Sequence, residues 1–133
     1  MIVVDTNVLA YLYLPGEHTQ AAETLLAQDA DWLAPVLWRS EFRNVLAGSL
    51  RRGWLTLAQA SAIQREAQDL MHGHEHEIDS DQVLQLVQRS DCSAYDCEFV
   101  ALAQQWGAPM VTMDSKILRA FPETARSLTS PLP

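Results

Sequence analysis

The chain opens with a short apolar run that ends abruptly in an acid, Met1-Ile2-Val3-Val4-Asp5, before a helix-compatible pattern begins at Val8. A run of this length and composition is typical of a strand buried on both faces of a parallel sheet. Asp5 is therefore expected at the carboxyl end of a central strand, which is where ligands bind in open α/β sheets. The alternative is that Asp5 only caps the helix that follows.

The same order of strand, acid and helix returns late in the sequence. Residues 110–113 form a second short apolar run, Asp114 follows it directly, and Ser115 begins another helical pattern. Helix capping is again the simpler explanation. If the two strands are parallel, however, their carboxyl ends meet at one sheet edge, and Asp5 and Asp114 are then predicted to lie close together.

Two further acids are predicted inside the apolar faces of helices. At 100° per residue, Glu41 falls within the apolar arc of a helix predicted over 35–52, with Pro35 in its first turn. Asp96 falls within that of a helix predicted over 93–106. A buried carboxylate is costly unless it is paired or binds a metal. The alternatives are a salt bridge or hydrogen bond for Glu41, and a capping role beside Ser93 for Asp96.

Three more helices and three more strands complete the expected fold. The helices are predicted over residues 17–28, 56–71 (with a Thr56–Gln59 capping box) and 80–90 (with Val83, Leu84 and Val87 buried). The helices 35–52 and 56–71 are expected to pack as a hairpin. Short strands are expected at 32–34, before Ile78 and near 125–129, and residues 130–133 are expected to fray.

Two groups of potential metal ligands are interpreted as structural. His72, His74 and His76 alternate, but no fixed third ligand accompanies them, so they are predicted to form a polar turn leading into a strand. Cys92 and Cys97 are predicted to be buried thiols, because two cysteines make no disulfide framework.

The size and charge of the chain narrow its function. Its 133 residues, 48% of them hydrophobic, predict one folded domain over 1–133. Neither a membrane span nor a signal peptide is visible, which favours a cytoplasmic protein with no membrane partner. A net charge of −8 argues against a general nucleic-acid binder, but not against an enzyme that reaches phosphates through a bound metal.

Taken together, the four acids predict a metal site. Parallel strands would bring Asp5 and Asp114 to one edge, and the two helices would point Glu41 and Asp96 into the same pit. Four carboxylates with no local Lys partner except Lys116 form an oxygen-rich site for a hard cation, best suited to Mg²⁺ or Mn²⁺.

The same residues carry a resemblance to a known family. The chain resembles the PIN-domain ribonucleases, and above all the VapC toxins of bacterial toxin–antitoxin pairs. The resemblance runs nearly end to end and rests on four motifs: Asp5-Thr6-Asn7-Val8 after a first strand, Glu41 in a long helix, Tyr95-Asp96 in SAYDCEFVALA, and Thr112-Met113-Asp114 in VTMDSKIL.

This resemblance implies a fold and a function. The fold would be an α/β, PIN-like three-layer arrangement, with a central parallel five-stranded sheet flanked by helices. The function would be Mg²⁺-dependent endonucleolytic cleavage of RNA by a metal-activated water, under the control of a cognate VapB-type antitoxin. Asp5 and Asp96 would be the main metal ligands, Glu41 and Asp114 would complete the catalytic set, and Asn7 and Thr112 would orient ligands or substrate.

Two other classes of protein share parts of this pattern, and the sequence also predicts protein partners. A receiver-like signalling domain gathers acids and Mg²⁺ at strand ends, but it needs a phosphoacceptor after a middle strand, which is not evident here. A catalytically silent PIN-type module that binds RNA or protein is the stronger rival. The apolar stripes of helices 17–28 and 56–71 predict a homodimer formed through helices. The acidic pit predicts that the antitoxin presents an Arg or Lys to it.

Overall fold

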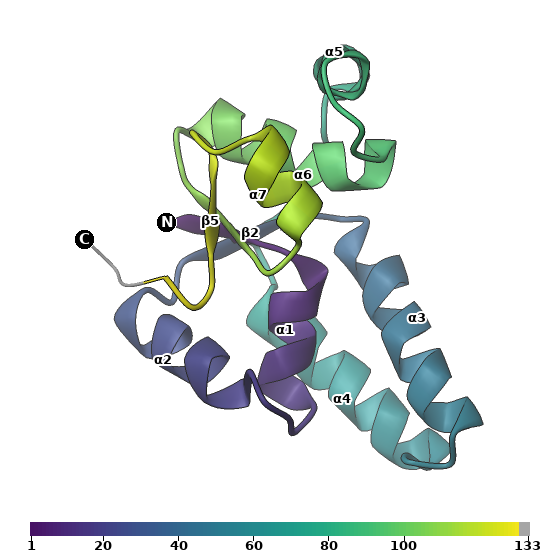
Figure 1. Ribbon diagram of the computed structural model, residues 1–133. Coiled ribbons are helices and arrows are strands. Elements are labelled where there is room, and N and C mark those ends of the chain that lie inside the picture. The colour runs from purple at the N-terminus through teal and green to yellow at the C-terminus, as the bar shows by residue number, and fades with distance from the viewer. Residues whose placement is uncertain (131–133) are drawn as a thin grey trace.

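The computed structural model describes residues 1–130 as three layers, with a sheet between two groups of helices (Figure 1). All but the first residue of the predicted frayed tail lie outside the described residues. The strands are β1 (Ile2–Val4), β2 (Trp32–Pro35), β3 (Glu75–His76), β4 (Met110–Thr112) and β5 (Ala125–Ser127). The helices are α1 (Thr6–Tyr13), α2 (Thr19–Gln28), α3 (Trp38–Arg51), α4 (Leu57–Leu70), α5 (Ser80–Gln88), α6 (Ala94–Trp106) and α7 (Ser115–Ala120).

The five strands form one parallel sheet in the order β3-β2-β1-β4-β5. The first strand therefore lies at the centre, where Val3 is opposite Leu33 on one side and Met110 on the other. All three residues of β1 are buried, as its unbroken apolar run predicts. The predicted α/β fold with a parallel five-stranded sheet is confirmed.

The helices divide between the two faces of the sheet. Figure 1 shows α1 to α4 on one side and α5 to α7 on the other. The main covering helix on the second side is α6, which contacts β1, β2 and β4 and buries Phe99, Val100 and Leu102. Within residues 1–130 no helix is long and apolar enough to cross a membrane.

The predicted start of the long helix is wrong by three residues. Pro35 was expected in its first turn, but Pro35 ends β2 and α3 begins at Trp38. The fixed backbone angle of proline suits the end of a strand as well as the start of a helix. Here the strand prevails, because its pairing with β3 continues through the Val36 N–H, which donates to the His76 carbonyl at 3.0 Å.

A three-residue clamp holds the start of α3 against β3. The Glu75 carboxylate accepts a hydrogen bond from the Trp38 indole N–H at 2.7 Å. It also accepts two from the Arg39 guanidinium, one from Nε and one from Nη2, each at 2.6 Å. Arg39 lowers the pKa of Glu75, and the Trp38 hydrogen bond acts in the same direction. Charge-assisted bidentate pairs of this kind fix geometry as well as add stability. The clamp therefore positions the helix that carries Glu41.

The helical hairpin and its capping box are confirmed, while Leu84, which was predicted to be buried, is exposed. Helix α4 packs on α3, and Thr56 and Gln59 exchange both hydrogen bonds of the box. Leu57 is 72% exposed, because it lies in the first turn of α4 at the free end of the hairpin. Leu84 is 60% exposed, and Leu86 is buried in its place where α5 packs on α6.

The histidine-rich segment forms the predicted turn and strand. His74 lies 3.3 Å from the Asp31 carboxylate, and the His76 ring stacks at a tilt on Trp106. Within residues 1–130 no cluster of three or more His, Cys, Asp or Glu side chains is arranged to hold a metal. Cys92 and Cys97 are free and buried, as predicted.

Replacing His72, His74 and His76 together with alanine should leave RNA cleavage within about twofold of wild type. These side chains lie outside the acidic cavity described below, and surface substitutions usually change stability by about 0.5 kcal/mol or less. Cleavage rate and melting temperature measured side by side check this. A folded triple variant without cleavage would show that the histidines form part of the active site.

Candidate active site

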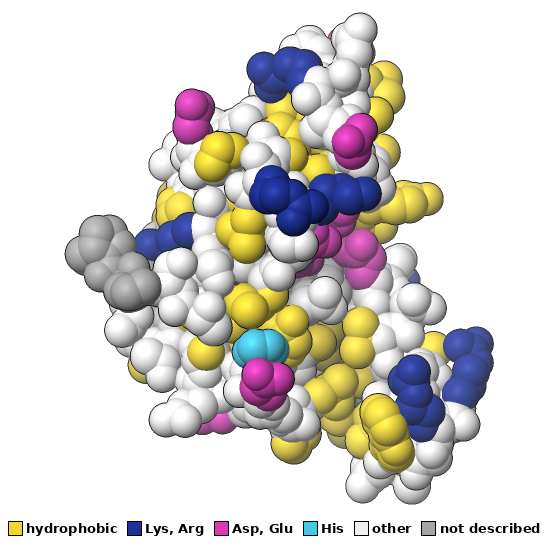
Figure 2. All heavy atoms as spheres, in the orientation of Figure 1, with side chains coloured by type: hydrophobic (Ala, Val, Ile, Leu, Met, Phe, Trp, Pro, Cys, Tyr) yellow, Lys and Arg dark blue, Asp and Glu magenta, His cyan; other side chains and the backbone are white. Residues whose placement is uncertain are grey.

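All four predicted acids line one cavity of about 520 Å³. It lies where α1, α3, α6 and the turn before α7 meet, beside the carboxyl ends of β1 and β4. Figure 2 shows Asp and Glu side chains gathered in the middle of this face. Asn7 also lines the cavity, and its predicted role in orienting substrate stays a prediction. The sequence-based grouping of these acids matches the geometry.

Asp5 is held by a hydroxyl from the neighbouring strand. The Thr112 hydroxyl donates to the Asp5 carboxylate at 2.7 Å, and Thr112 is completely buried. The Asp5 side chain makes no capping hydrogen bond to α1, so the capping alternative is wrong for this acid. Burial raises the pKa of Asp5, as do the charges of Asp96 and Asp114, against the Thr112 hydrogen bond.

Asp114 does cap its helix and is tied to the same threonine. Its carboxylate accepts the Lys116 and Ile117 N–H groups at 2.8 and 3.2 Å, so the capping interpretation holds here. Its own N–H donates to the Thr112 hydroxyl at 3.0 Å. One buried hydroxyl thus connects the backbone before α7 to the Asp5 carboxylate. Capping uses one oxygen of Asp114, while the residue still lines the cavity.

Glu41 is half-buried and has a partner from α1. The Thr6 hydroxyl donates to its carboxylate at 2.8 Å. Within residues 1–130 Glu41 forms no ion pair, so of its two structural alternatives the hydrogen bond is observed and the salt bridge is not. Burial raises the pKa of Glu41, and the charges of Asp5 and Asp96 add to this effect against the Thr6 hydrogen bond.

Asp96 lies in the first turn of α6, whose cap is Ser93. The Ser93 hydroxyl accepts the Asp96 N–H at 3.0 Å, as the sequence suggests. Burial raises the pKa of Asp96, and the charge of Asp114 raises it further. The Ser93 hydroxyl and the charge of Lys116 act in the opposite direction. Ser93 therefore supplies the side-chain cap of α6, and the Asp96 carboxylate is left free to line the cavity.

The donor chemistry of the cavity suits a hard divalent cation, although within residues 1–130 no three of its acids are arranged closely enough to hold one as they stand. Three of its carboxylates have a raised pKa, in each case partly because another acid of the group lies nearby. Within residues 1–130 no Lys or Arg forms an ion pair with any of the four. The polar groups that line the cavity carry oxygen donors without sulfur or imidazole, a set that suits Mg²⁺ or Mn²⁺. A bound cation would offset the mutual repulsion of these charges.

Sequence reasoning assigned no role to some residues that shape the site. Thr6 stood only as part of the first motif, although its hydroxyl holds Glu41. Ser40 and Asn44 line the cavity beside Glu41, one residue before it and one turn after it. A helical wheel centred on Glu41 would have found Asn44. The Thr6 contact requires the relative placement of α1 and α3, which no local pattern contains.

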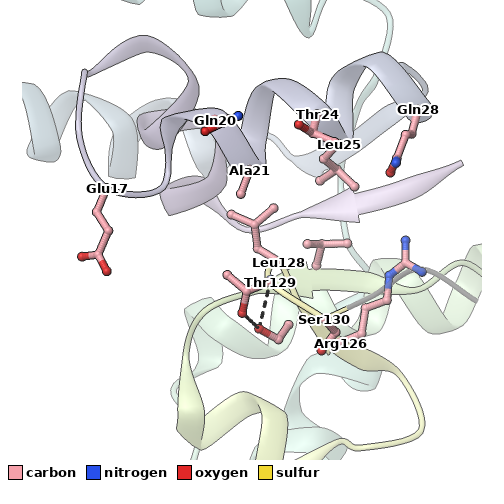
Figure 3. A pocket seen from close by; sticks show the side chains of 12 residues that line it. Glu17, Gln20, Ala21, Thr24, Leu25, Gln28, Arg126, Leu128, Thr129 and Ser130 are labelled. Carbon is pink, nitrogen blue, oxygen red and sulfur yellow. Dashed lines mark hydrogen bonds between the residues drawn. The ribbon is translucent and has the colours of Figure 1, made fainter.

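A larger cavity, of about 650 Å³, lies away from these acids. It opens between α2 and β5, with Leu25 and Leu128 facing each other and Arg126 at one end (Figure 3). Among the described residues that line it, Glu17 is the one carboxylate. Its wall is otherwise made of amides, hydroxyls and aliphatic groups, which offer no general base or metal site. The smaller acidic cavity is therefore the candidate active site.

Comparisons with known proteins identify the fold and the family of the chain. The sequence is 28% identical over 124 residues to Ribonuclease VapC3 of Pyrobaculum aerophilum, covering 91% of this chain and 95% of that protein. FitAcB from Neisseria gonorrhoeae has a similar fold, with a TM-score of 0.74 at 18% identity over 96% of this chain and 98% of that one.

A second solved structure of the same fold comes from a toxin–antitoxin complex of Klebsiella pneumoniae. Its TM-score is 0.71 at 18% identity, over 98% of this chain and 100% of that one. Likeness at such identities shows the fold. The family itself is shown by a sequence model, described as PIN domain, that matches residues 2–123. This chain belongs to the PIN domain family.

Proposed function

We propose that this protein is a divalent-metal-dependent endoribonuclease, the toxin of a type II toxin–antitoxin pair that acts in the cytoplasm. The observation that carries the proposal is the convergence of Asp5, Glu41, Asp96 and Asp114 on one cavity. The relative called Ribonuclease VapC3 and the fold shared with a toxin–antitoxin complex support it. A catalytically silent PIN-type module remains the alternative, and nothing in the four intact acids favours it.

Asp5 and Asp96 would hold the cation, which is Mg²⁺ or Mn²⁺ by the chemistry of the donors. When bound, the cation supplies neutralisation of the phosphate oxygens and a more acidic water. Thr112 keeps the Asp5 carboxylate in place, and Thr6 does the same for Glu41. The raised pKa of Glu41 suits it to accept the proton that the attacking water loses. Attack in line on the phosphorus would leave a 5′-phosphate and a 3′-hydroxyl.

The remaining predicted groups have supporting positions. Asn7 lines the cavity on an exposed part of α1, where it can orient the substrate. The backbone N–H groups of the first turn of α7 hold the Asp114 carboxylate where it lines the cavity. Because water rather than the ribose 2′-hydroxyl would be the nucleophile, RNA with a 2′-deoxy residue before the scissile phosphate should still be cleaved.

We also propose two protein partners, an antitoxin and a second copy of the chain. A groove of about 440 Å³ runs between α3 and α4, and its wall includes Leu46, Leu50 and Leu57. An antitoxin segment lying in this groove could extend an Arg toward the acidic cavity, where a guanidinium pairs with carboxylates bidentately. The homodimer is proposed to form through helices. The apolar stripes of α2 and α4 are the surfaces proposed for it.

Cleavage and thermal stability measured with and without metal test the proposal. In millimolar Mg²⁺ or Mn²⁺ the protein should cut single-stranded RNA, and EDTA should abolish cutting. The same ions should raise the melting temperature, since an ion bound only to the folded state stabilises it by about 2.7 kcal/mol at 100 times its Kd.

Asp5→Asn is the matched control for both readouts. Metal should raise its melting temperature less than that of the wild type, and the variant should not cut RNA. Equal melting temperatures of the wild type in EDTA and Mn²⁺, together with metal-independent cutting, would contradict metal dependence. A folded, metal-binding protein that cuts no RNA would favour the silent module.

A further inference from the structure

The positive charge of this acidic protein is concentrated in one segment. Residues 42–65, which form most of the α3–α4 hairpin, contain four arginines and no Asp, Glu or Lys. The whole chain has 9 basic and 17 acidic residues, so the other 109 residues carry 5 and 17, a net charge of −12 against +4 for the segment. Figure 2 shows Lys or Arg side chains beside hydrophobic ones at the free end of this hairpin.

The free end of the hairpin, residues 50–54 (here the hairpin tip), presents an aromatic ring with a guanidinium against it. Trp54 is 70% exposed, and the Arg52 guanidinium lies 5.0 Å from the centre of its ring. Within residues 1–130 neither Arg51 nor Arg52 forms an ion pair with an acid. A role for Arg51 at the end of α3 is explained by the helix dipole, but the exposed indole is not.

A missing side chain leaves room for this arrangement. A Cβ at Gly48 would lie 3.0 Å from the Arg52 guanidinium nitrogen, so glycine at this position lets the arginine lie back along α3. The exposed Arg52 guanidinium therefore approaches both Gly48 and the Trp54 ring. An Arg and a Trp held together form a platform on which nucleic acid bases stack, whatever their identity.

The hairpin tip and the active site are on the same face of α3. At 100° per residue, Arg52 falls within about 20° of Glu41, and Gly48 lies between them on that face. Eleven residues separate Glu41 from Arg52, which is about 16 Å along the helix. At a stacked spacing of roughly 3.4 Å, five nucleotides span this distance. Asn44 and Val45, which line the cavity, begin the path between the two.

We propose, on the basis of the function proposed above, that the hairpin tip binds a single-stranded segment of the RNA substrate several nucleotides from the cleavage point. Trp54, supported by Arg52, stacks on a base, and Arg51 and Arg52 contact phosphates. Charge complementarity selects RNA over a protein partner for this surface, since most of the rest of the molecule repels a polyanion. The net charge of −8 disfavours RNA binding by most of the protein surface, and the hairpin tip would supply a sequence-independent affinity for RNA.

A charge-matched pair of triple variants tests the proposal. The tip variant is Arg51→Gln/Arg52→Gln/Trp54→Ala. The control, Arg89→Gln/Arg126→Gln/Trp106→Ala, also removes two positive charges and one exposed tryptophan, but at places outside the hairpin. Both are made in the full chain and in an Asp96→Asn background, in which RNA can be bound in Mg²⁺ without being cut. The probe is a fluorescein-labelled single-stranded RNA, and the readouts are its Kd and the dependence of Kd on salt.

The tip variant should bind this RNA about 10- to 100-fold more weakly, and the control within about twofold of the parent. Loss of two phosphate contacts should reduce the slope of log K against log salt by about 1.4. In the cleaving protein, KM should rise while kcat changes little. Trp54→Phe should restore most of the affinity lost in Trp54→Ala, and these single changes carry the test if the triple variant fails to fold.

Equal RNA affinity of the tip variant and its parent would overturn the proposal, even if cleavage is intact. Loss of self-association with unchanged RNA affinity, measured by sedimentation, would overturn it by assigning the tip to a contact between copies. A third outcome is that the wild type cuts no RNA but still binds RNA through the tip. This result would contradict the proposed nuclease function and support the proposed binding surface.

Discussion

Asn in place of Asp5 or of Asp96 should reduce RNA cleavage by roughly a thousandfold or more while the protein stays folded. Each change removes one charge that would hold the metal and keeps nearly the same shape. Metal ions contribute several kcal/mol to stabilising transition-state charge, and each 1.36 kcal/mol is a factor of ten in rate. Expression of the wild type should arrest growth of the host cell, and expression of either variant should not.

Stability should move in the opposite direction from activity in these variants. Burial and neighbouring acids raise the pKa of Asp5, so the ionised carboxylate destabilises the metal-free folded state near neutral pH. A raised pKa contributes stability that is present below the unfolded value and lost as pH rises through the folded value. Metal-free Asp5→Asn should therefore be at least as stable as wild type at pH 7. Its advantage should disappear as the pH approaches the ordinary aspartate value of about 4.

Urea unfolding of both proteins in EDTA across this pH range checks the sign. Asp69→Asn, which removes an exposed charge from α4, is the control and should leave both cleavage and its pH dependence unchanged. Near wild-type cleavage by a folded Asp5→Asn or Asp96→Asn protein would remove that acid from the catalytic set.

Phe42→Ala should destabilise the fold by about 3–5 kcal/mol. Phe42 is completely buried and packs edge-on against Trp38 at 5.7 Å and Tyr13 at 6.3 Å between ring centres. The change removes the ring that joins α1 to α3, the two helices that carry Thr6 and Glu41. A loss of this size in a chain of this length should lower the melting temperature by about 10 °C or more.

Leu57→Ala is the matched control on the same hairpin. Leu57 is as apolar as Phe42 but 72% exposed, so its loss should change stability by about 0.5 kcal/mol or less. Thermal or urea unfolding of the two variants compares buried and exposed apolar groups directly. Comparable destabilisation by both would mean that Leu57 is covered in solution, as a partner or a second copy would cover it.

Local patterns predicted most of the fold, and failed where tertiary packing decides. The apolar run before Asp5 identified the central strand, and the Thr56–Gln59 pair identified the start of α4. The helix start predicted at Pro35 was wrong, because the backbone angle of proline also fits the end of a strand. The burial predicted for Leu84 was wrong, because a helical stripe shows which residues share a face and not whether another element covers the whole of that face.

The site was predictable in its acids and not in the groups that hold them. Carboxylates in apolar surroundings are conspicuous in any sequence, so all four could be found and grouped. The hydroxyl of Thr6 is unremarkable until α1 and α3 are placed, and the same applies to Glu75, whose partners Trp38 and Arg39 come from another element.

The hydrogen bond from Thr112 to Asp5 has a consequence for the protein while it is being made. It joins residues 107 positions apart, and the central strand that carries Asp5 gains its second neighbour only when β4 has been synthesised. A nascent chain that already contains Asp5, Glu41 and Asp96 therefore still lacks strand β4 beside β1. It also lacks the Thr112 hydroxyl that orients Asp5. The proposed nuclease would therefore stay inactive until β4 has been synthesised, and a chain truncated after Gly107 should be harmless when expressed.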